Sequence, residues 1–481
     1  MLKAFIKLIQ AFLIVTLITA CATPTISTNI YTIPIHKAST SVGDDITNSV
    51  LLGGNGMDWV TNISCPSSEQ FTVFGGTHKS FGESTDFIAI SSALNNNILW
   101  AKTYGGPHKD SLFHADKVND GGYLLLGESR SLFYTMLPGH KTARPFILKL
   151  SNLGIPEWSV LLNPGTNSLV GQLVDFHQTR DGGYIFVGQS RFGNQDNYKW
   201  DITMVKLNNT GELLWNKRYQ NTFDTRAVSV IETSDGSIIA VGHTQKDGSS
   251  AKTNEIVVLK TDKNGILKWE KNYRAESGAI YPNELLLDKN GLIVTGLSLD
   301  KKNNYFSSKL TLDGKLTWAK SYNLPEEISK LPIASTILPN GKIVISGFSG
   351  AKKIQPKNGG YYRGMFALAL IVKPNGDIEY FTHIGGERNE EIRALQALKN
   401  GNLCVALNTE SFDATYSDIL VTHWKPSSHT KQDKSLSIPI EIKTSNSNVA
   451  VTGVEAKHES LPLNLITVND LIPVLKRKTN E

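Results

Sequence analysis

The sequence predicts an all-β protein made of repeated four-stranded sheets, and three observations predict it. The composition favours strands and turns over helices, because the 481 residues include 40 Gly, 15 Tyr and 8 Trp but only 5 Met. One strand-like phrase recurs seven times along the chain, and a large aromatic residue recurs with it. Hydrophobic residues make up 40% and charged residues 19% of the chain, so it can bury a core and is unlike a disordered chain.

The recurring phrase marks the second strand of each repeat. It reads DGGYIFVGQS at residues 181–190, where an apolar run follows a Gly-rich turn. The last glycine of the phrase recurs at intervals of 51 to 61 residues. Its positions are Gly75, Gly127, Gly188, Gly242, Gly296 and Gly347, with Leu407 in the seventh copy. A period of this length with only short apolar runs indicates a unit of four strands rather than a helical solenoid.

A second phrase supplies the third and fourth strands. Residues 201–219, DITMVKLNNTGELLWNKRY, show it in full: an apolar run ending in Lys-Leu, a hairpin turn, and Trp-x-x-x-Tyr. Turns such as Asn264-Gly265 and Asp313-Gly314 supply the positive φ angles of tight hairpins. The aromatic series is Trp100, Trp158, Trp215, Trp269 and Trp318, with Tyr380 in the sixth copy. We interpret these side chains as packing between neighbouring sheets.

Seven four-stranded antiparallel repeats predict a seven-bladed β-propeller over residues 47–425. The seventh repeat stops after its third strand, at residues 417–424. Residues 48–54 read NSVLLGG, which matches the end of the fourth strand in other repeats. We therefore expect the N-terminal strand to complete the last blade, because this closure removes an exposed sheet edge.

The C-terminal extension, residues 426–481, lies outside the repeats. We expect it to be partly disordered or to form a β-hairpin from residues 438–443 and 449–454. Both alternatives stay open at this stage.

The repeat phrases resemble those of bacterial secreted propellers of the kind DGGY-x-x-x-G … KLD-x-x-G-x-x-x-W. More distantly they are similar to kelch repeats and to quinoprotein-like propellers. The resemblance extends over about residues 47–425. It implies the propeller fold and says almost nothing about chemistry.

The N-terminus has the features of an export signal. Two lysines precede an apolar run at residues 11–20, which is too short to span the roughly 30 Å of a bilayer core. Residues 18–21 read ITAC, which resembles the lipobox of bacterial lipoproteins. The resemblance implies that residues 1–20 are a signal peptide and that Cys21 receives lipid chains such as palmitate.

The expected location follows from this lipid anchor. Acyl chains on Cys21 would attach the protein to a membrane of the bacterial cell envelope. Ala22, rather than an aspartate, follows the cysteine and favours the outer membrane in a Gram-negative host. Residues 21–46 are then a tether, and the propeller would face the periplasm or the cell surface.

The sequence offers no known catalytic motif. We find no H-E-x-x-H, P-loop, G-x-S-x-G or C-x-x-C, so we expect no enzyme activity, no cofactor and no metal site. The net charge of +5 is too small to indicate nucleic acid. Besides Cys21, the chain has Cys65 in the first repeat and Cys404 in the seventh. These blades are neighbours in a closed ring, so a disulfide and two buried thiols both remain open.

The longest loops gather on one face of the predicted ring. In a four-stranded meander, the loops after the second and fourth strands share a face, and we call this the loop face. The loops after the second strands carry fourteen Lys or Arg and six Asp or Glu, and loops on a rigid scaffold often carry binding residues. The candidate binding residues are Phe133, Tyr134, Arg191, Tyr198, Trp200, Lys352, Lys353, Tyr361, Tyr362 and Arg363. A solvated basic rim is the alternative.

Two functions are compatible with these features. The first is a non-catalytic scaffold that presents its loop face to a protein partner in the cell envelope, since aromatic and Arg side chains anchor many interfaces. The second is a propeller that binds or cleaves an envelope polysaccharide at the mouth of its central channel. A pair of converging carboxylates would favour cleavage, whereas aromatic side chains without such a pair would favour binding.

Overall fold

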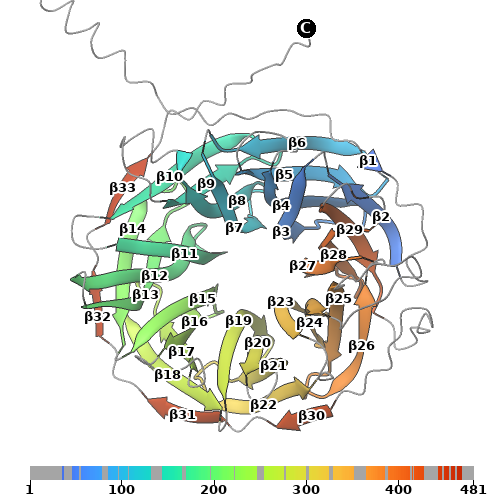
Figure 1. The fold of residues 1–481 in the computed structure, drawn as a ribbon. Helices are drawn as coiled ribbons and strands as arrows, with labels where there is room; N and C mark the ends of the chain where they lie inside the picture. Colours follow the sequence, from blue (N-terminus) through green and yellow to red (C-terminus); the bar gives the residue numbers. More distant parts are fainter. Residues whose placement is uncertain are drawn as a thin grey trace, which may run out of the picture.

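The computed structural model describes residues 46–426 with gaps, of which the longest are 132–142, 246–253 and 351–364. It also describes residues 35–36 and four short strands of the C-terminal extension. The strands form seven sheets arranged in a closed ring (Figure 1), which confirms the seven-bladed propeller. No helix among these described residues is long and apolar enough to cross a membrane.

Each blade is an antiparallel sheet whose strands follow one another from the centre of the ring to the outside. The innermost strands are β3 (Met57–Ser64), β7 (Asp110–Lys117), β11 (Leu169–Gln178), β15 (Asp224–Glu232), β19 (Ala279–Asp288), β23 (Ser329–Ile337) and β27 (Glu390–Ala397). The second strands are β4 (Gln70–His78), β8 (Tyr123–Ser129), β12 (Tyr184–Asn194), β16 (Ile238–Gln245), β20 (Gly291–Leu299), β24 (Ile343–Gly350) and β28 (Leu403–Thr409).

The outer half of each blade has the same order. The third strands are β5 (Thr85–Ala93), β9 (Arg144–Leu150), β13 (Asn197–Leu207), β17 (Glu255–Thr261), β21 (Asn303–Leu310), β25 (Met365–Val372) and β29 (Asp418–Trp424). The fourth strands of blades 1 to 6 are β6 (Ile98–Tyr104), β10 (Pro156–Pro164), β14 (Leu213–Gln220), β18 (Leu267–Ala275), β22 (Leu316–Asn323) and β26 (Ile378–Ile384).

The N-terminal strand closes the ring. The fourth strand of blade 7 is β2 (Ile46–Leu52), which pairs with β29 and places Leu52 opposite Ile419. The short strand β1 (Ile35–His36) pairs with the outer edge of β2. Because β3 of blade 1 follows β2 directly in the chain, the pairing of β2 with β29 ties the first blade to the last. The predicted closure is therefore present.

The C-terminal extension lies along the outside of the ring (Figure 1). Its strands are β30 (Lys443–Asn446) on blade 5, β31 (Val449–Gly453) on blade 4, β32 (Lys457–Ser460) on blade 3 and β33 (Leu463–Thr467) on blade 2. Each is a fifth strand antiparallel to the fourth strand of its blade. The expected hairpin is absent among these residues, because β30 and β31 pair with different blades rather than with each other.

The core lies between neighbouring blades. Apolar side chains from one sheet pack against those of the next, as Ile185 and Met204 of blade 3 pack with Ala240 and Leu259 of blade 4. All four of these side chains are at most 1% exposed. At about 25 cal/mol per Å² of buried apolar surface, this blade-to-blade contact is the main stabilising term of the fold.

The recurring glycine of the second strand is explained by an irregularity in the first strand. Every innermost strand shifts register at the residue that pairs with this position. The shift brings a backbone carbonyl against the glycine: a Cβ on Gly242 would lie 2.2 Å from the oxygen of Arg226, and one on Gly75 would lie 1.9 Å from that of Trp59. A residue without a side chain fits so close an approach without rearrangement at these positions, whereas blade 7 has the buried Leu407 beside the same register shift.

The recurring tryptophan packs on the next blade, as interpreted from the sequence. A Cβ on Gly265, in the outer turn of blade 4, would lie 2.9 Å from the Trp215 ring of blade 3. The Tyr219 hydroxyl donates to the carbonyl of Gly265 at 2.9 Å. The equivalent pairs are Trp100 with Gly154, Trp158 with Gly211, Trp269 with Gly314, and Trp318 with Gly376. The sixth blade has Tyr380 instead, and blade 7 has no outer turn to receive a tryptophan because its fourth strand comes from the N-terminus.

Candidate functional site

One long hairpin projects from the loop face. Strands β12 and β13 of blade 3 have 11 residues each, whereas the strands of most other blades have seven to nine. Their register places Arg191 opposite Trp200 and Gly193 opposite Tyr198. The hairpin therefore brings together three residues that the sequence analysis selected as candidate binding residues.

The described part of the loop face carries an array of aromatic and basic side chains next to this hairpin. The guanidinium carbon of Arg226, at the start of β15, lies 5.9 Å from the centre of the Trp200 ring. Arg226 is opposite His243 in the sheet of blade 4, and the His243 ring packs edge-on against Tyr281 of blade 5 with centroids 5.3 Å apart. We call Trp200, Arg226, His243 and Tyr281 the aromatic–basic array.

The array is positioned by the repeat itself. Arg226 and Tyr281 lie near the beginnings of innermost strands, and His243 directly follows the recurring Gly242. These positions belong to the end of the blade that faces the loops. Sequence reasoning found only Trp200, because it searched the long loops. Counting from the recurring glycine of each blade would have identified the other positions.

Burial sets the charge of the array. The pKa of His243 is lowered to about 4, first by burial and then by the neighbouring Arg226 cation. Burial also raises the pKa of Tyr281. Both side chains are therefore neutral at neutral pH, and Arg226, which is exposed, carries the positive charge. A cation over an aromatic face contributes about 0.5–1 kcal/mol at an exposed site.

A further tryptophan lies at the equivalent position of blade 1. Trp59 pairs with Gly76 in the same way that Arg226 pairs with His243. Its ring covers that glycine, since a Cβ on Gly76 would lie 2.1 Å from Trp59 Cζ2. The loop-face ends of blades 1, 3 and 5 therefore carry the aromatic residues Trp59, Trp200 and Tyr281.

Carboxylates and histidines occupy the innermost strands closer to the opposite face. Asp175 accepts a hydrogen bond from the Val230 amide at 2.9 Å and lies 3.3 Å from Nδ1 of His114. Glu284 accepts from the amide and the hydroxyl of Ser335 at 2.6 and 2.7 Å. Each carboxylate therefore binds the backbone of the following blade.

The surroundings of these groups shift their pKa values. Burial raises the pKa of Glu284 to about 7. The pKa of Asp116 is also raised, because protein surrounds it within the ring although its side chain is accessible to water. Burial lowers the pKa of His177. No three His, Cys, Asp or Glu side chains in the described part of the chain are grouped so that they could hold a metal ion.

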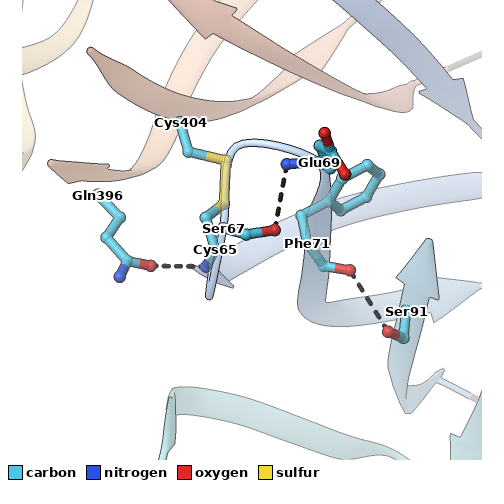
Figure 2. Close-up of a disulfide and its surroundings, with 7 residues drawn as sticks. All are labelled: Cys65, Ser67, Glu69, Phe71, Ser91, Gln396 and Cys404. Atoms are coloured by element: carbon cyan, nitrogen blue, oxygen red, sulfur yellow. Dashed lines mark hydrogen bonds between the residues drawn. A yellow bond between two sulfur atoms is a disulfide. The ribbon is translucent and has the colours of Figure 1, made fainter. Parts of the chain in front are cut away.

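The two remaining cysteines form a disulfide (Figure 2). Cys65 follows β3 of blade 1, and Cys404 lies in β28 of blade 7. The Cys65 amide also donates to the Gln396 side chain at 2.7 Å, and Gln396 belongs to β27 of blade 7. Of the two alternatives left open by the sequence, the structure has the disulfide, and it joins the first blade to the last.

Several predicted site residues lie outside the described residues. This holds for the lipidation candidate Cys21 and for seven of the candidate binding residues, and Tyr198 is described only by its backbone. The seven are Phe133, Tyr134, Lys352, Lys353, Tyr361, Tyr362 and Arg363. Their roles stay predictions.

No family model matches the chain, and no curated protein matches it. Solved structures similar to it include an apocarotenoid oxygenase of Synechocystis, with 10% identity, a TM-score of 0.41, and coverage of 84% of this chain and 96% of that one. Another is a subtype N11 neuraminidase-like protein of an influenza virus from a flat-faced bat. It has 11% identity and a TM-score of 0.35, and the match covers 84% of this chain and 98% of that one. A third is a GH32 β-fructofuranosidase of Bombyx mori. It has 12% identity and a TM-score of 0.30, and the match covers 82% of this chain and 93% of that one. No activity of this chain follows from likenesses of this degree.

Proposed function

We propose that the protein is a lipid-anchored lipoprotein of the bacterial cell envelope, and that its propeller is a non-catalytic scaffold that binds a protein partner through the loop face. The observation that carries the binding role is the aromatic–basic array beside the long hairpin of blade 3. Trp, Tyr and Arg are the side chains that most often dominate interface energies. The array offers all three across blades 3, 4 and 5.

One observation supports an exported protein, and a second shows how a lipid anchor would hold it. The disulfide between Cys65 and Cys404 is of a kind that persists in oxidising compartments such as the periplasm and the cell surface. The N-terminal strand β2 is part of the ring, so a lipid on Cys21 would hold the whole propeller near the membrane through residues 22–45. Replacing Cys21 with Ser should release the protein from the membrane fraction of cells. A variant that stays membrane-bound would contradict the lipoprotein proposal.

The contacts of the inner carboxylates support a scaffold rather than an enzyme. Asp175 and Glu284 accept hydrogen bonds from the backbone of neighbouring blades. These hydrogen bonds link neighbouring blades, so the two carboxylates have a structural role. If either carboxylate turned toward a substrate, a buried backbone amide would lose its hydrogen-bond acceptor.

A second candidate is polysaccharide binding, and the aromatic residues at the loop-face ends of three blades favour it. Trp59, Trp200 and Tyr281 come from blades 1, 3 and 5, and aromatic faces stack on the apolar faces of sugar rings. Cleavage of a polysaccharide has less support, because it needs a pair of carboxylates. Asp116 is accessible to water and has a raised pKa, but Asp175 and Glu284 are bound to the backbone of the following blades.

The binding proposal is tested with two variants and a matched control. Arg226→Glu and Trp200→Ala alter the array, whereas Lys263→Glu reverses an exposed charge in the outer turn of blade 4, on the opposite face. Crosslinking in cells followed by affinity purification should recover at least five times less partner with either array variant and an unchanged amount with Lys263→Glu. Equal recovery from all three variants would contradict a binding role for the array. Retention of the wild type in a gel that contains envelope polysaccharide would favour the second candidate.

A further inference from the structure

The four fifth strands of the C-terminal extension follow one register. The residue that lies four positions after the recurring tryptophan is Leu162, Tyr219, Tyr273 or Tyr322, in blades 2 to 5. The pairs, in the order of the extension, are Thr444 with Tyr322, Val451 with Tyr273, His458 with Tyr219 and Leu465 with Leu162. Each partner comes seven residues after the previous one. The extension is therefore a belt in which each seven-residue step reaches one blade.

The belt has a direction. It pairs first with blade 5, then with blades 4, 3 and 2, against the order of the repeats in the chain. Seven extended residues cover at most about 23 Å, and the steps between the strands are short. The next blade in this direction is blade 1, whose fourth strand is β6. In the described part of the structure, β6 pairs with β5 and with no strand on its outer side (Figure 1).

We propose that the end of the chain continues the belt, and that residues 470–475 pair with β6 as the fifth strand of blade 1. The belt has reached blade 2 at Thr467, and 14 residues of the chain follow it, which is enough for one more step. The same register places Ile472 opposite Tyr104 and Val474 opposite Lys102. This segment reads DLIPVL, and basic residues begin only after it, at Lys476.

An uncovered outer strand invites pairing with other chains, and a fifth strand removes that exposed edge. The belt would also bring the C-terminal end of the chain to blade 1. Blade 1 is the neighbour of blade 7, where the N-terminal strands β1 and β2 enter the ring. The last strand of the belt would then lie one blade away from β1 and β2.

The proposal is tested by amide hydrogen exchange in the full chain and in two truncations. One truncation ends at Asn469 and removes the whole segment, and the other ends at Leu475 and removes only the basic tail. Loss of the segment should accelerate exchange of the β6 amides at least tenfold, while the shorter truncation leaves them unchanged. Peptides from β14 and β18, which the belt already covers, should exchange equally in all three proteins.

Three results would overturn the proposal. The first is a β6 exchange rate that is the same in all three proteins. The second is protection of β6 that rises with protein concentration, which would assign the edge to a second copy of the chain. The third comes from paired cysteines: Lys102→Cys should form a disulfide faster with Val474→Cys than with Lys478→Cys, because opposite residues in a sheet lie about 5 Å apart at Cβ. Equal rates would contradict the register.

Discussion

At the scale of single residues, each recurring side chain of the fourth strand acts at the boundary between two blades. In blade 3, the Trp215 ring lies on Gly265 of blade 4 and the Tyr219 hydroxyl binds the carbonyl of that glycine. The neighbouring Leu214 points away from this boundary and is 55% exposed. Conservation of the spacing within the chain therefore reflects contact with the next blade rather than the needs of the strand itself.

We predict that Trp215→Ala lowers the free energy of unfolding by about 2 kcal/mol, since a partly buried ring and its contact with the turn are lost. Leu214→Ala is the matched control on the same strand and should change it by less than about 0.5 kcal/mol. Urea unfolding, monitored by far-ultraviolet circular dichroism so that the signal does not depend on tryptophan fluorescence, provides the measurement. An equal loss in both variants would show that the ring does not stabilise the boundary.

A buried carboxyl at another boundary makes stability depend on pH. Glu270 in β18 is 5% exposed and accepts a hydrogen bond from the Asn221 side chain. Burial raises its pKa from 4.5 to about 7, and the nearby Asp201 carboxylate adds to the shift. The folded protein holds this proton more tightly than the unfolded chain does. Glu270 therefore reduces stability as the pH rises from about 4.5 through about 7.

We predict that Glu270→Gln removes this loss, because an amide keeps the Asn221 hydrogen bond and cannot ionise. The variant should gain up to about 3 kcal/mol over the wild type at pH 8 and should match it within about 0.5 kcal/mol near pH 4. Urea unfolding at both pH values gives the comparison. A difference that does not change with pH would mean that the pKa of Glu270 is the same in the folded and the unfolded protein.

At the scale of the element, the outer hairpin turn carries both a backbone requirement and a packing requirement. Gly265, in the β17–β18 turn, has a φ of +72° and is covered by Trp215. Gly236, in the β15–β16 turn of the same blade, has a φ of +76° but nothing within 4 Å of a Cβ. The two glycines therefore separate the cost of the left-handed backbone from the cost of the contact.

We predict that Gly236→Ala lowers the free energy of unfolding by about 1 kcal/mol, which is the cost of a non-glycine residue in the left-handed region. Gly265→Ala should cost about 1–2 kcal/mol more, because its methyl group also displaces the Trp215 ring. The difference should disappear in a Trp215→Ala background. If it persists there, the contact with the tryptophan does not explain the requirement for glycine.

The same scale shows what the sequence could and could not predict. The strands and turns of each repeat followed from local signals, since they depend on residues close together in the chain. The closing strand followed from the repeat pattern, because residues 48–54 match the end of the fourth strands although they pair with β29 at the other end of the repeats. The aromatic–basic array did not, because Trp200, Arg226 and Tyr281 belong to three blades and meet only when the ring forms. The belt was also missed: its strands are short and polar in part, and their seven-residue step is visible only beside the strands with which they pair.

At the scale of the whole molecule, a β-strand and a disulfide both link blade 1 to blade 7. The first is β2, which is covalently continuous with blade 1 and pairs with β29 of blade 7. The second is the disulfide from Cys65 to Cys404, which links residues separated by 339 positions in the sequence. Separation of the first blade from the last would open the ring, and both links resist this separation.

We predict that strand β2 and the Cys65–Cys404 disulfide are energetically coupled in a double-mutant cycle. Replacing both Cys65 and Cys404 with Ser should cost about 2–5 kcal/mol, and deleting residues 47–54 should lower the melting temperature because the edge of β29 is exposed. With both changes, the loss of unfolding free energy should exceed the sum of the separate losses by at least about 1 kcal/mol, since blade 1 is then held to blade 7 only by side-chain packing and single hydrogen bonds such as that of Cys65 with Gln396. Deleting residues 22–34, which precede the described strands, is the control and should leave the melting temperature within about 1 °C. Strict additivity of the two changes would show that the strand and the disulfide stabilise their own blades and do not act together on the closure of the ring.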